Sequence, residues 1–90
     1  MELVKTLTII NKLGLHARAA TKLVELANQY ESEILIEQDE QSAPANSVLA
    51  LLMLGSGMGK EVTVKCKGDD AQAAMDDIEN LIANKFDEGE

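Results

Sequence analysis

The chain has 90 residues, the size of one domain, and a formal net charge of −8 at pH 7. This charge argues against nucleic acid and anionic membranes as partners, because both repel an acidic protein. The hydrophobic fraction of 46% with 2% aromatic residues indicates a globular domain with an aliphatic core. A single cysteine excludes an internal disulfide, and the N-terminus does not resemble a signal peptide. We therefore expect one cytoplasmic domain over residues 1–90, without a membrane-spanning segment.

The first half of the chain predicts two strands around a helix. Residues 3–10 are rich in β-branched side chains and predict a strand, which the turn-forming residues after it end. Apolar residues at helical spacing then predict a helix over residues 17–30, and residues 32–38 predict a second strand. Residues 39–45 can hold a turn and a short strand. Because Pro44 has no N–H to donate, that strand belongs at a sheet edge.

The second half predicts a short helix, a strand and a final helix. The short helix covers residues 48–54, with Asn46 or Ser47 as its N-cap and Gly55 as its end. A clean alternation of apolar and polar residues predicts a strand over residues 61–67.

The final helix covers residues 71–84, after a turn in residues 68–70 that supplies its N-cap. The resulting element order is β-α-β-β-α-β-α. Alternating strand faces imply that helices cover one side of the sheet and water the other. The predicted fold class is therefore α+β, a two-layer sandwich.

The only histidine of the chain, His16, directly precedes the first predicted helix. On composition alone, a lone histidine is a surface or half-buried polar residue. However, the unpaired N–H groups of a first helical turn, together with the helix dipole, form an anion site. The dipole also opposes a positive imidazolium and so favours a neutral, nucleophilic ring. One geometry thus suits both a nucleophilic imidazole and its phosphorylated form.

Two neighbours of His16 strengthen the functional hypothesis. Arg18 is either an exposed arginine or a donor of charge-assisted hydrogen bonds to phosphoryl oxygens. A cation is slightly unfavourable at a helix N-terminus, which favours the second interpretation. Gly14 is either an ordinary turn glycine or a residue needed for positive φ or a close backbone approach.

No metal or cofactor is predicted. The chain has one histidine and one cysteine, fifty residues apart, and Cys66 alternates with apolar neighbours that predict a core position. The stretch "GSGMGK" resembles a phosphate-binding loop only superficially. It lacks the strand before it and the Ser or Thr after its lysine, so it is not a nucleotide site.

Residues 48–54 carry no polar side chain. A helix in a two-layer domain buries only one stripe, so part of this segment should remain exposed and form a docking surface. Next to His16, such a surface would suit delivery to several partners. Ser47, just before it, is either an N-cap hydroxyl or a regulatory phosphorylation site.

The stretches "GLHARAATKLV" and "NSVLALLMLGSGMGKEVTV" resemble the two conserved blocks of the histidine-containing phosphocarrier protein (HPr) family of the bacterial phosphoenolpyruvate-dependent phosphotransferase system. The resemblance covers essentially the whole chain. It implies an open-faced sandwich, in which a four-stranded antiparallel sheet carries three helices on one face.

The resemblance also implies a function. Enzyme I, phosphorylated from phosphoenolpyruvate, would pass the phosphoryl group to Nδ1 of His16, which would donate it to an enzyme IIA protein. The chain would then be a monomeric carrier in a relay rather than an independent enzyme. Arg18 and the backbone amide of Ala17 would stabilise the phosphate. The side chains implied in partner docking are Val48, Leu49 and Leu52.

Two details refine this expectation. The stretch "ANSVLALLML" resembles the nitrogen-related branch (NPr) of the family, which implies a regulatory outcome rather than sugar uptake. The family usually has proline after the arginine of its motif, whereas this chain has Ala19. Because alanine also suits a first helical turn, we expect activity to survive, with the geometry of the phosphorylated site as the open question.

A second hypothesis is a non-carrier binding module that regulates a partner protein allosterically. In relatives of that kind the histidine is typically replaced. The presence of both His16 and Arg18 therefore favours the carrier.

Overall fold

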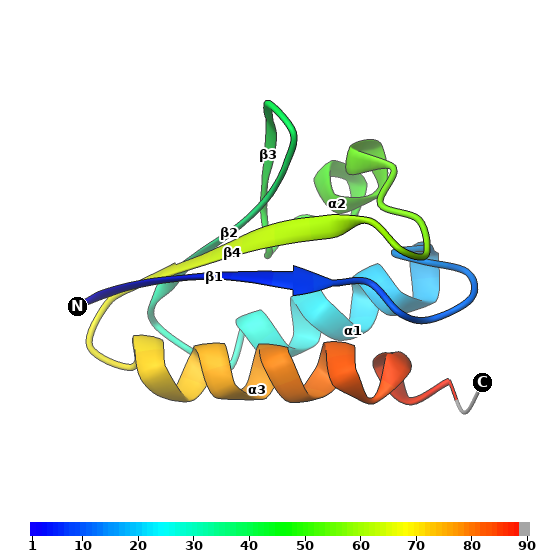
Figure 1. The fold of residues 1–90 in the computed structure, drawn as a ribbon. Helices are drawn as coiled ribbons and strands as arrows, with labels where there is room; N and C mark the ends of the chain where they lie inside the picture. The colour runs from blue at the N-terminus through cyan, green and yellow to red at the C-terminus, as the bar shows by residue number, and fades with distance from the viewer. Residues whose placement is uncertain (89–90) are drawn as a thin grey trace.

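The computed structural model describes residues 1–88, which form four strands, three α-helices and a short 3₁₀ helix (Figure 1). In chain order these are β1 (Glu2–Thr8), α1 (Ala17–Ala27), β2 (Glu33–Gln38), β3 (Gln41–Pro44), α2 (Val48–Leu54), β4 (Glu61–Lys67), α3 (Ala71–Ala83) and η1 (Lys85–Asp87). The order β-α-β-β-α-β-α confirms the predicted α+β class.

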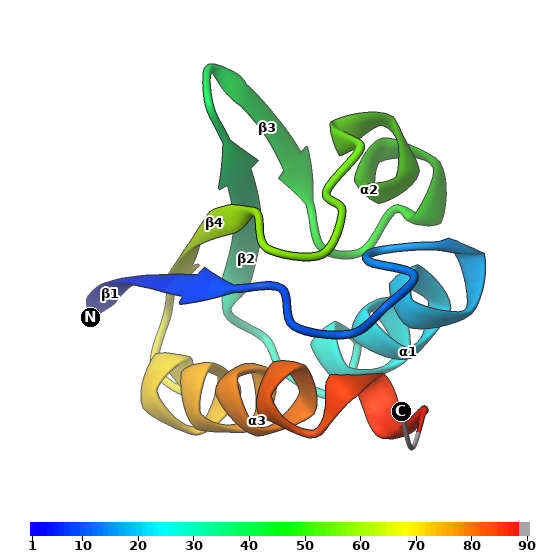
Figure 2. The same ribbon diagram turned by 45° about the vertical axis from the view of Figure 1, so that its right-hand side comes forward.

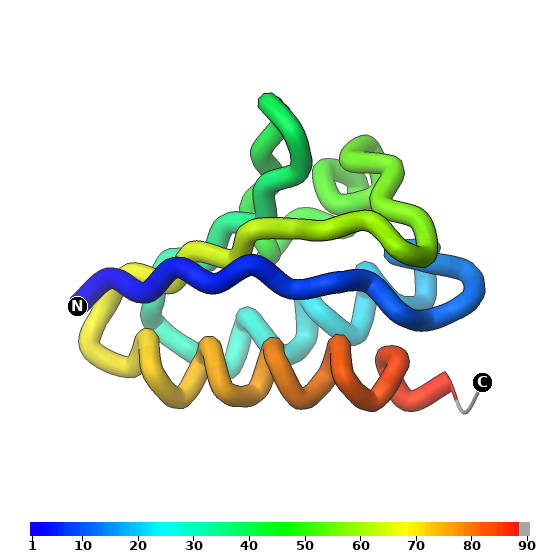
Figure 3. The backbone as a smooth tube through the Cα atoms, in the orientation of Figure 1, coloured from blue at the N-terminus to red at the C-terminus, as the bar shows by residue number. Residues whose placement is uncertain are grey.

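The four strands form one antiparallel sheet in the order β1-β4-β2-β3. The backbone trace shows β1 and β4 running side by side through the middle of the molecule (Figure 3). The short strand β3 lies at the sheet edge and contains Pro44, as predicted from the missing N–H. α1 and α3 lie along one face of the sheet, and α2 packs beside β3 (Figures 1 and 2).

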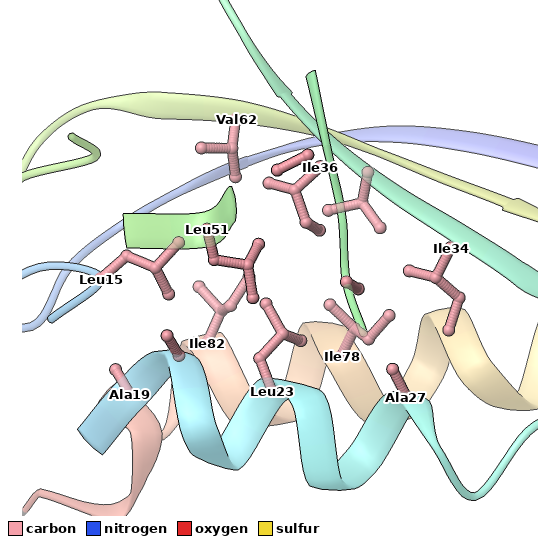
Figure 4. Close-up of a cluster of buried hydrophobic side chains, with 14 of the residues drawn as sticks. Leu15, Ala19, Leu23, Ala27, Ile34, Ile36, Leu51, Val62, Ile78 and Ile82 are labelled. Atoms are coloured by element: carbon pink, nitrogen blue, oxygen red, sulfur yellow. The ribbon is translucent and has the colours of Figure 1, made fainter. Parts of the chain in front are cut away.

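All three helices contribute to one aliphatic core against the inner face of the sheet. Leu23 of α1, Leu51 of α2 and Ile78 of α3 are each at most 1% exposed, and their side chains lie in the space between the helices and the sheet (Figure 4). Cys66 of β4 is also fully buried, which confirms its predicted core position. The core is what fixes α1 and α2 relative to each other, and therefore what positions the site described below.

The outer face of the sheet carries polar side chains. The hydroxyls of Thr6 and Thr63 lie 3.4 Å apart across β1 and β4, and Lys65 pairs with Glu37 at 3.2 Å. This pattern is typical of an antiparallel sheet with one covered and one solvated face.

Two predicted boundaries were wrong in detail. The first strand ends at Thr8 rather than at residue 10, although the buried Ile9 still donates its N–H to the Lys60 carbonyl at 2.9 Å and accepts the Gly59 N–H at 2.7 Å. The first helix ends at Ala27 rather than at residue 30. Tyr30 donates its N–H to the carbonyl of Ala27 in a turn, and its ring leaves the helix axis to meet α3.

The predicted N-cap position before α3 is confirmed, but the cap has no side-chain bond to the helix. The side chain of Asp70, the cap residue, instead accepts hydrogen bonds from the N–H groups of Glu31 and Ser32, each at 2.9 Å, and from the Ser32 hydroxyl. These bonds, the Ser32 hydroxyl foremost, lower the pKa of Asp70. Asp70 thus ties the start of β2 to the start of α3.

Tyr30, the only tyrosine, should titrate abnormally. Its hydroxyl donates to the Asp77 carboxylate, and this bond with burial raises the pKa of Tyr30 from 10.0 to about 12. Because the folded-state pKa is the higher one, the stabilisation is complete below pH 10.0 and is lost as the pH rises through about 12. We expect an ultraviolet phenolate titration to show this, and Asp77→Asn to move the pKa down. Asp76→Asn is the matched control and should change it little; a wild-type pKa near 10.0 would contradict the assignment.

Candidate functional site

His16 caps the N-terminus of α1. Its backbone is extended, with φ −81° and ψ −177°, and its carbonyl accepts the N–H of Ala20 at 2.8 Å. The imidazole Nδ1 accepts the N–H of Arg18 at 3.3 Å, so the ring itself satisfies one of the unpaired amides of the first turn. The predicted place of His16 at the helix start is therefore confirmed.

The loop before His16 depends on Gly14. Its φ is +67°, and a Cβ at this position would lie 2.5 Å from the carbonyl oxygen of Ser56, in the loop after α2. The N–H of Leu15 donates to that same oxygen at 2.8 Å. Both glycine roles considered from the sequence therefore apply here: a left-handed backbone and a close approach between two loops.

The C-terminal segment reaches the same site from the other side. After α3 the chain makes the left-handed turn η1, in which Phe86 is fully buried. Next, the Glu88 carboxylate contacts Nε2 of His16 through Oε2 and accepts a hydrogen bond from Asn11 Nδ2 at 2.9 Å through Oε1. Asn11 Nδ2 also donates to the Gly14 carbonyl at 2.7 Å. The Arg18 amide and the Glu88 carboxylate thus contact the His16 ring, and Asn11 holds Glu88 in place.

These contacts assign different roles to the two ring nitrogens. A carboxylate only accepts hydrogen bonds, so Nε2 beside Glu88 carries a proton. A backbone N–H only donates, so Nδ1 beside the Arg18 amide offers a lone pair. Nδ1 is therefore the nucleophilic atom of the ring, and it faces the positive end of the α1 dipole.

The ring is accessible. His16, Ala17, Arg18, Leu13 and Glu88 line a hollow in the surface, and the His16 side chain is 26% exposed. Arg18 lies exposed on the first turn of α1, on the same side as the hollow that it lines. The arrangement suits a dianion bound at Nδ1, with amide N–H groups and a guanidinium around it.

Ala19 is fully buried, and α1 begins at Ala17 without the proline that is usual after the arginine. Alanine at this position therefore forms the helix start as expected. Its small side chain packs into the core, where Figure 4 shows it beside α1 and below Leu15.

The α2 surface is partly exposed, as its composition predicted. Leu49 is 69% exposed and Leu52 is 38% exposed, whereas Val48 is half-buried and packs against the core. Other large apolar side chains that the structure leaves exposed near α2 and the His16 loop are Leu13, Met53 and Met58. The assignment of Val48, Leu49 and Leu52 to partner docking stays a prediction.

Ser47 acts as the N-cap of α2, since its Oγ accepts the N–H of Ala50 at 3.2 Å. Gly55 ends the helix with a left-handed φ of 67°, as predicted. Modification of Ser47 stays a prediction.

Within residues 1–88, no group of three or more histidine, cysteine or acidic side chains is placed to hold a metal ion. The helices of this part of the chain are all too short or too polar to cross a membrane.

Three site residues were missed in the sequence. They are Asn11, in the turn after β1, and Phe86 and Glu88, in the acidic segment after α3. One signal could have found the tail: Phe86 continues the spacing of Ile78 and Ile82, four residues apart on the buried stripe of α3. The contact between Glu88 and His16 has no local signal, because 72 residues separate them.

Comparisons with known proteins show the family and the fold. The family described as "PTS HPr component phosphorylation site" matches residues 3–84. Phosphocarrier protein NPr of Shewanella violacea is 58% identical over 87 residues, which cover 97% of this chain and 96% of that protein. Phosphocarrier protein HPr of Cupriavidus necator is 47% identical over 83 residues, covering 92% and 93%. The crystal structure of HPr-C-His from Thermoanaerobacter tengcongensis superposes with a TM-score of 0.92 at 36% identity, covering 96% and 97%.

Proposed function

Because the chain belongs to the HPr family of phosphocarrier proteins of the phosphotransferase system, we propose that His16 accepts a phosphoryl group from phosphorylated enzyme I and passes it to an enzyme IIA protein. The observation that supports this most directly is the orientation of the ring. Nδ1 carries no proton and lies at the N-terminus of α1 beside a surface hollow lined by Arg18, where its lone pair accepts only the exposed Arg18 N–H at 3.3 Å.

The transfer would proceed by in-line attack. The Nδ1 lone pair forms the new bond to phosphorus while the bond to the donor protein breaks, and the donor keeps that electron pair. The Nε2 proton stays in place. The Arg18 amide, which bonds Nδ1 in the free protein, is then available to a phosphoryl oxygen, as is the Ala17 amide. The Arg18 guanidinium supplies positive charge for the dianion, and Arg18 is the basic residue that lines the hollow beside His16.

The same geometry serves both directions of transfer. The α1 dipole and Arg18 stabilise the phosphoryl group, but these interactions are exposed to water and therefore modest. A carrier needs such a balance, because a group held too firmly could not be passed on. The exposed side chains of Leu49 and Leu52 would seat the partner during either step.

The 58% identity to a phosphocarrier protein NPr supports the nitrogen-related branch. The proposed acceptor is therefore a nitrogen-type enzyme IIA, and the carrier would act in the cytoplasm as a monomer.

The test is incubation with enzyme I and phosphoenolpyruvate, followed by intact mass measurement. We expect the gain of one phosphoryl group that is lost in acid, since a phosphorus–nitrogen bond is acid-labile. Ser47→Ala should gain the same group, which separates histidine from serine modification. Adding a nitrogen-type or a sugar-type enzyme IIA then shows which of them removes the group faster. A wild-type protein that gains nothing from phosphorylated enzyme I would refute the proposal.

A further inference from the structure

The contact between the C-terminal segment and the His16 ring has a consequence for the chemistry. We propose that Glu88 is a positioning residue for His16: its carboxylate keeps the proton on Nε2, and so keeps Nδ1 as the lone-pair nitrogen. The importance of this for phosphoryl transfer rests on the proposed function, in which Nδ1 is the acceptor. The effect of Glu88 on the protonation of the ring does not depend on the proposed function.

Burial of Glu88 supports the proposal first. Its side chain is only 7% exposed although it lies in an acidic segment close to the end of the chain. A buried carboxylate is unfavourable unless donors satisfy it. Both of its oxygens have partners, Oε1 with Asn11 Nδ2 and Oε2 with His16 Nε2. A tail touching the surface by chance would leave the carboxylate in water.

Asn11 makes this arrangement rigid. It is fully buried, and its Nδ2 bonds both the Gly14 carbonyl and Glu88, at 2.7 and 2.9 Å. The amide is therefore anchored to the loop that carries His16. Glu88 is in this way fixed to the same loop as the ring that it orients.

The backbone before Glu88 is held in an unusual conformation. Lys85, Phe86 and Asp87 are three consecutive non-glycine residues with φ of 56°, 54° and 62°. L-residues adopt this left-handed region at a cost, so surrounding contacts must maintain it. Burial of the Phe86 ring on one side and the two bonds of Glu88 on the other provide those contacts.

The chemical effect follows from the properties of imidazole. A neutral ring carries its proton on one nitrogen only, and the hydrogen bond at one nitrogen selects the state of the other. Carboxylates that accept a hydrogen bond from the N–H of a histidine ring fix the orientation of the ring and raise the basicity of its second nitrogen. Here the second nitrogen is Nδ1, at the start of α1.

The experiment uses the fact that the chain has one histidine. Labelling histidine with ¹⁵N gives only two ring signals, whose shifts report the proton on each nitrogen at a pH where the ring is neutral. We would compare the full-length wild type with Glu88→Ala, Glu88→Gln and the control Asp87→Asn. The Asp87→Asn substitution removes one negative charge at the neighbouring residue, whose side chain is 61% exposed.

In the wild type and in Asp87→Asn we expect Nε2 protonated and Nδ1 unprotonated. In Glu88→Ala we expect a fraction of rings with the proton on Nδ1, and Glu88→Gln, which keeps one acceptor oxygen, should lie between. Phosphoryl uptake by Glu88→Ala should be roughly tenfold slower, the lower end of the loss known for carboxylates that orient metal-bound histidines. A purely structural role would lower the melting temperature without moving the ring signals.

Two outcomes separate this proposal from the proposed function. Ring signals of a folded Glu88→Ala and Glu88→Gln that match the wild type would overturn the positioning role, whatever the uptake rate. The other outcome is that the ring signals change on Glu88 replacement while enzyme I fails to phosphorylate the wild-type protein. That result would leave the positioning role intact and refute the carrier function. If Glu88→Ala does not fold, Glu88→Gln decides alone.

Discussion

Replacement of His16 by asparagine should abolish phosphoryl uptake and destabilise the fold less than His16→Ala does, because asparagine keeps the cap of α1. Asparagine is among the best N-cap residues, so its side-chain oxygen can accept the Arg18 N–H that Nδ1 accepts now. The amide cannot act as a nucleophile toward phosphorus. The variant therefore separates the two functions of His16, one in capping α1 and one in chemistry.

Intact mass after incubation with enzyme I and phosphoenolpyruvate measures the first effect, and urea unfolding measures the second. His16→Ala is the matched variant, because it removes the nucleophile and the cap together. It should fail equally in uptake and be less stable than His16→Asn by about 1 kcal/mol. Phosphoryl gain by His16→Asn would show that another residue carries the group.

Replacement of Phe86 by alanine should lower the free energy of unfolding by about 3–5 kcal/mol. Phe86 is the largest fully buried side chain among the described residues, and its removal leaves a cavity where η1 meets the core. Small domains are stable by only about 5–15 kcal/mol, so this loss is a large part of the total. The left-handed turn also loses its main contact, and Glu88 should separate from His16.

Urea unfolding followed by circular dichroism gives the magnitude. Leu13→Ala is the control, because Leu13 is 65% exposed and its truncation should change stability by less than about 0.5 kcal/mol. The ¹⁵N ring signals of His16 in a folded Phe86→Ala should resemble those of Glu88→Ala. A stability change as small as that of Leu13→Ala would contradict the packing of the tail.

The parts of the fold with a local signal were predictable from the sequence. Strand β4 has the bounds Glu61–Lys67 that its alternation indicated, and α2 lies between the Ser47 cap and Gly55 as predicted. Both follow from short-range rules of periodicity and capping. The end of α1 was missed because Tyr30 continues the helical spacing but packs against Asp77 of α3 instead.

The residues of the site also differ in whether a local sequence signal predicts them. The position of His16 at a helix start, with Arg18 on the first turn, could be predicted from a dozen consecutive residues. Glu88 could not, because its role depends on where the tail lies after α3 has packed. A left-handed turn without glycine also has no sequence signature, since its conformation is maintained by burial of Phe86 rather than by local preference.

The close contact between Gly14 and Ser56 couples the His16 loop to the loop after α2. The carbonyl of Ser56 accepts the Leu15 N–H, and the missing Cβ of Gly14 lets the two loops touch. The segment carrying the reactive ring and the segment ending α2 therefore move as one piece. If α2 is the docking surface, as proposed, a bound partner would meet Nδ1 of His16 at a set distance and angle, with no hinge to close. Different partners would then each need a surface complementary to the same rigid arrangement of α2 and the His16 loop.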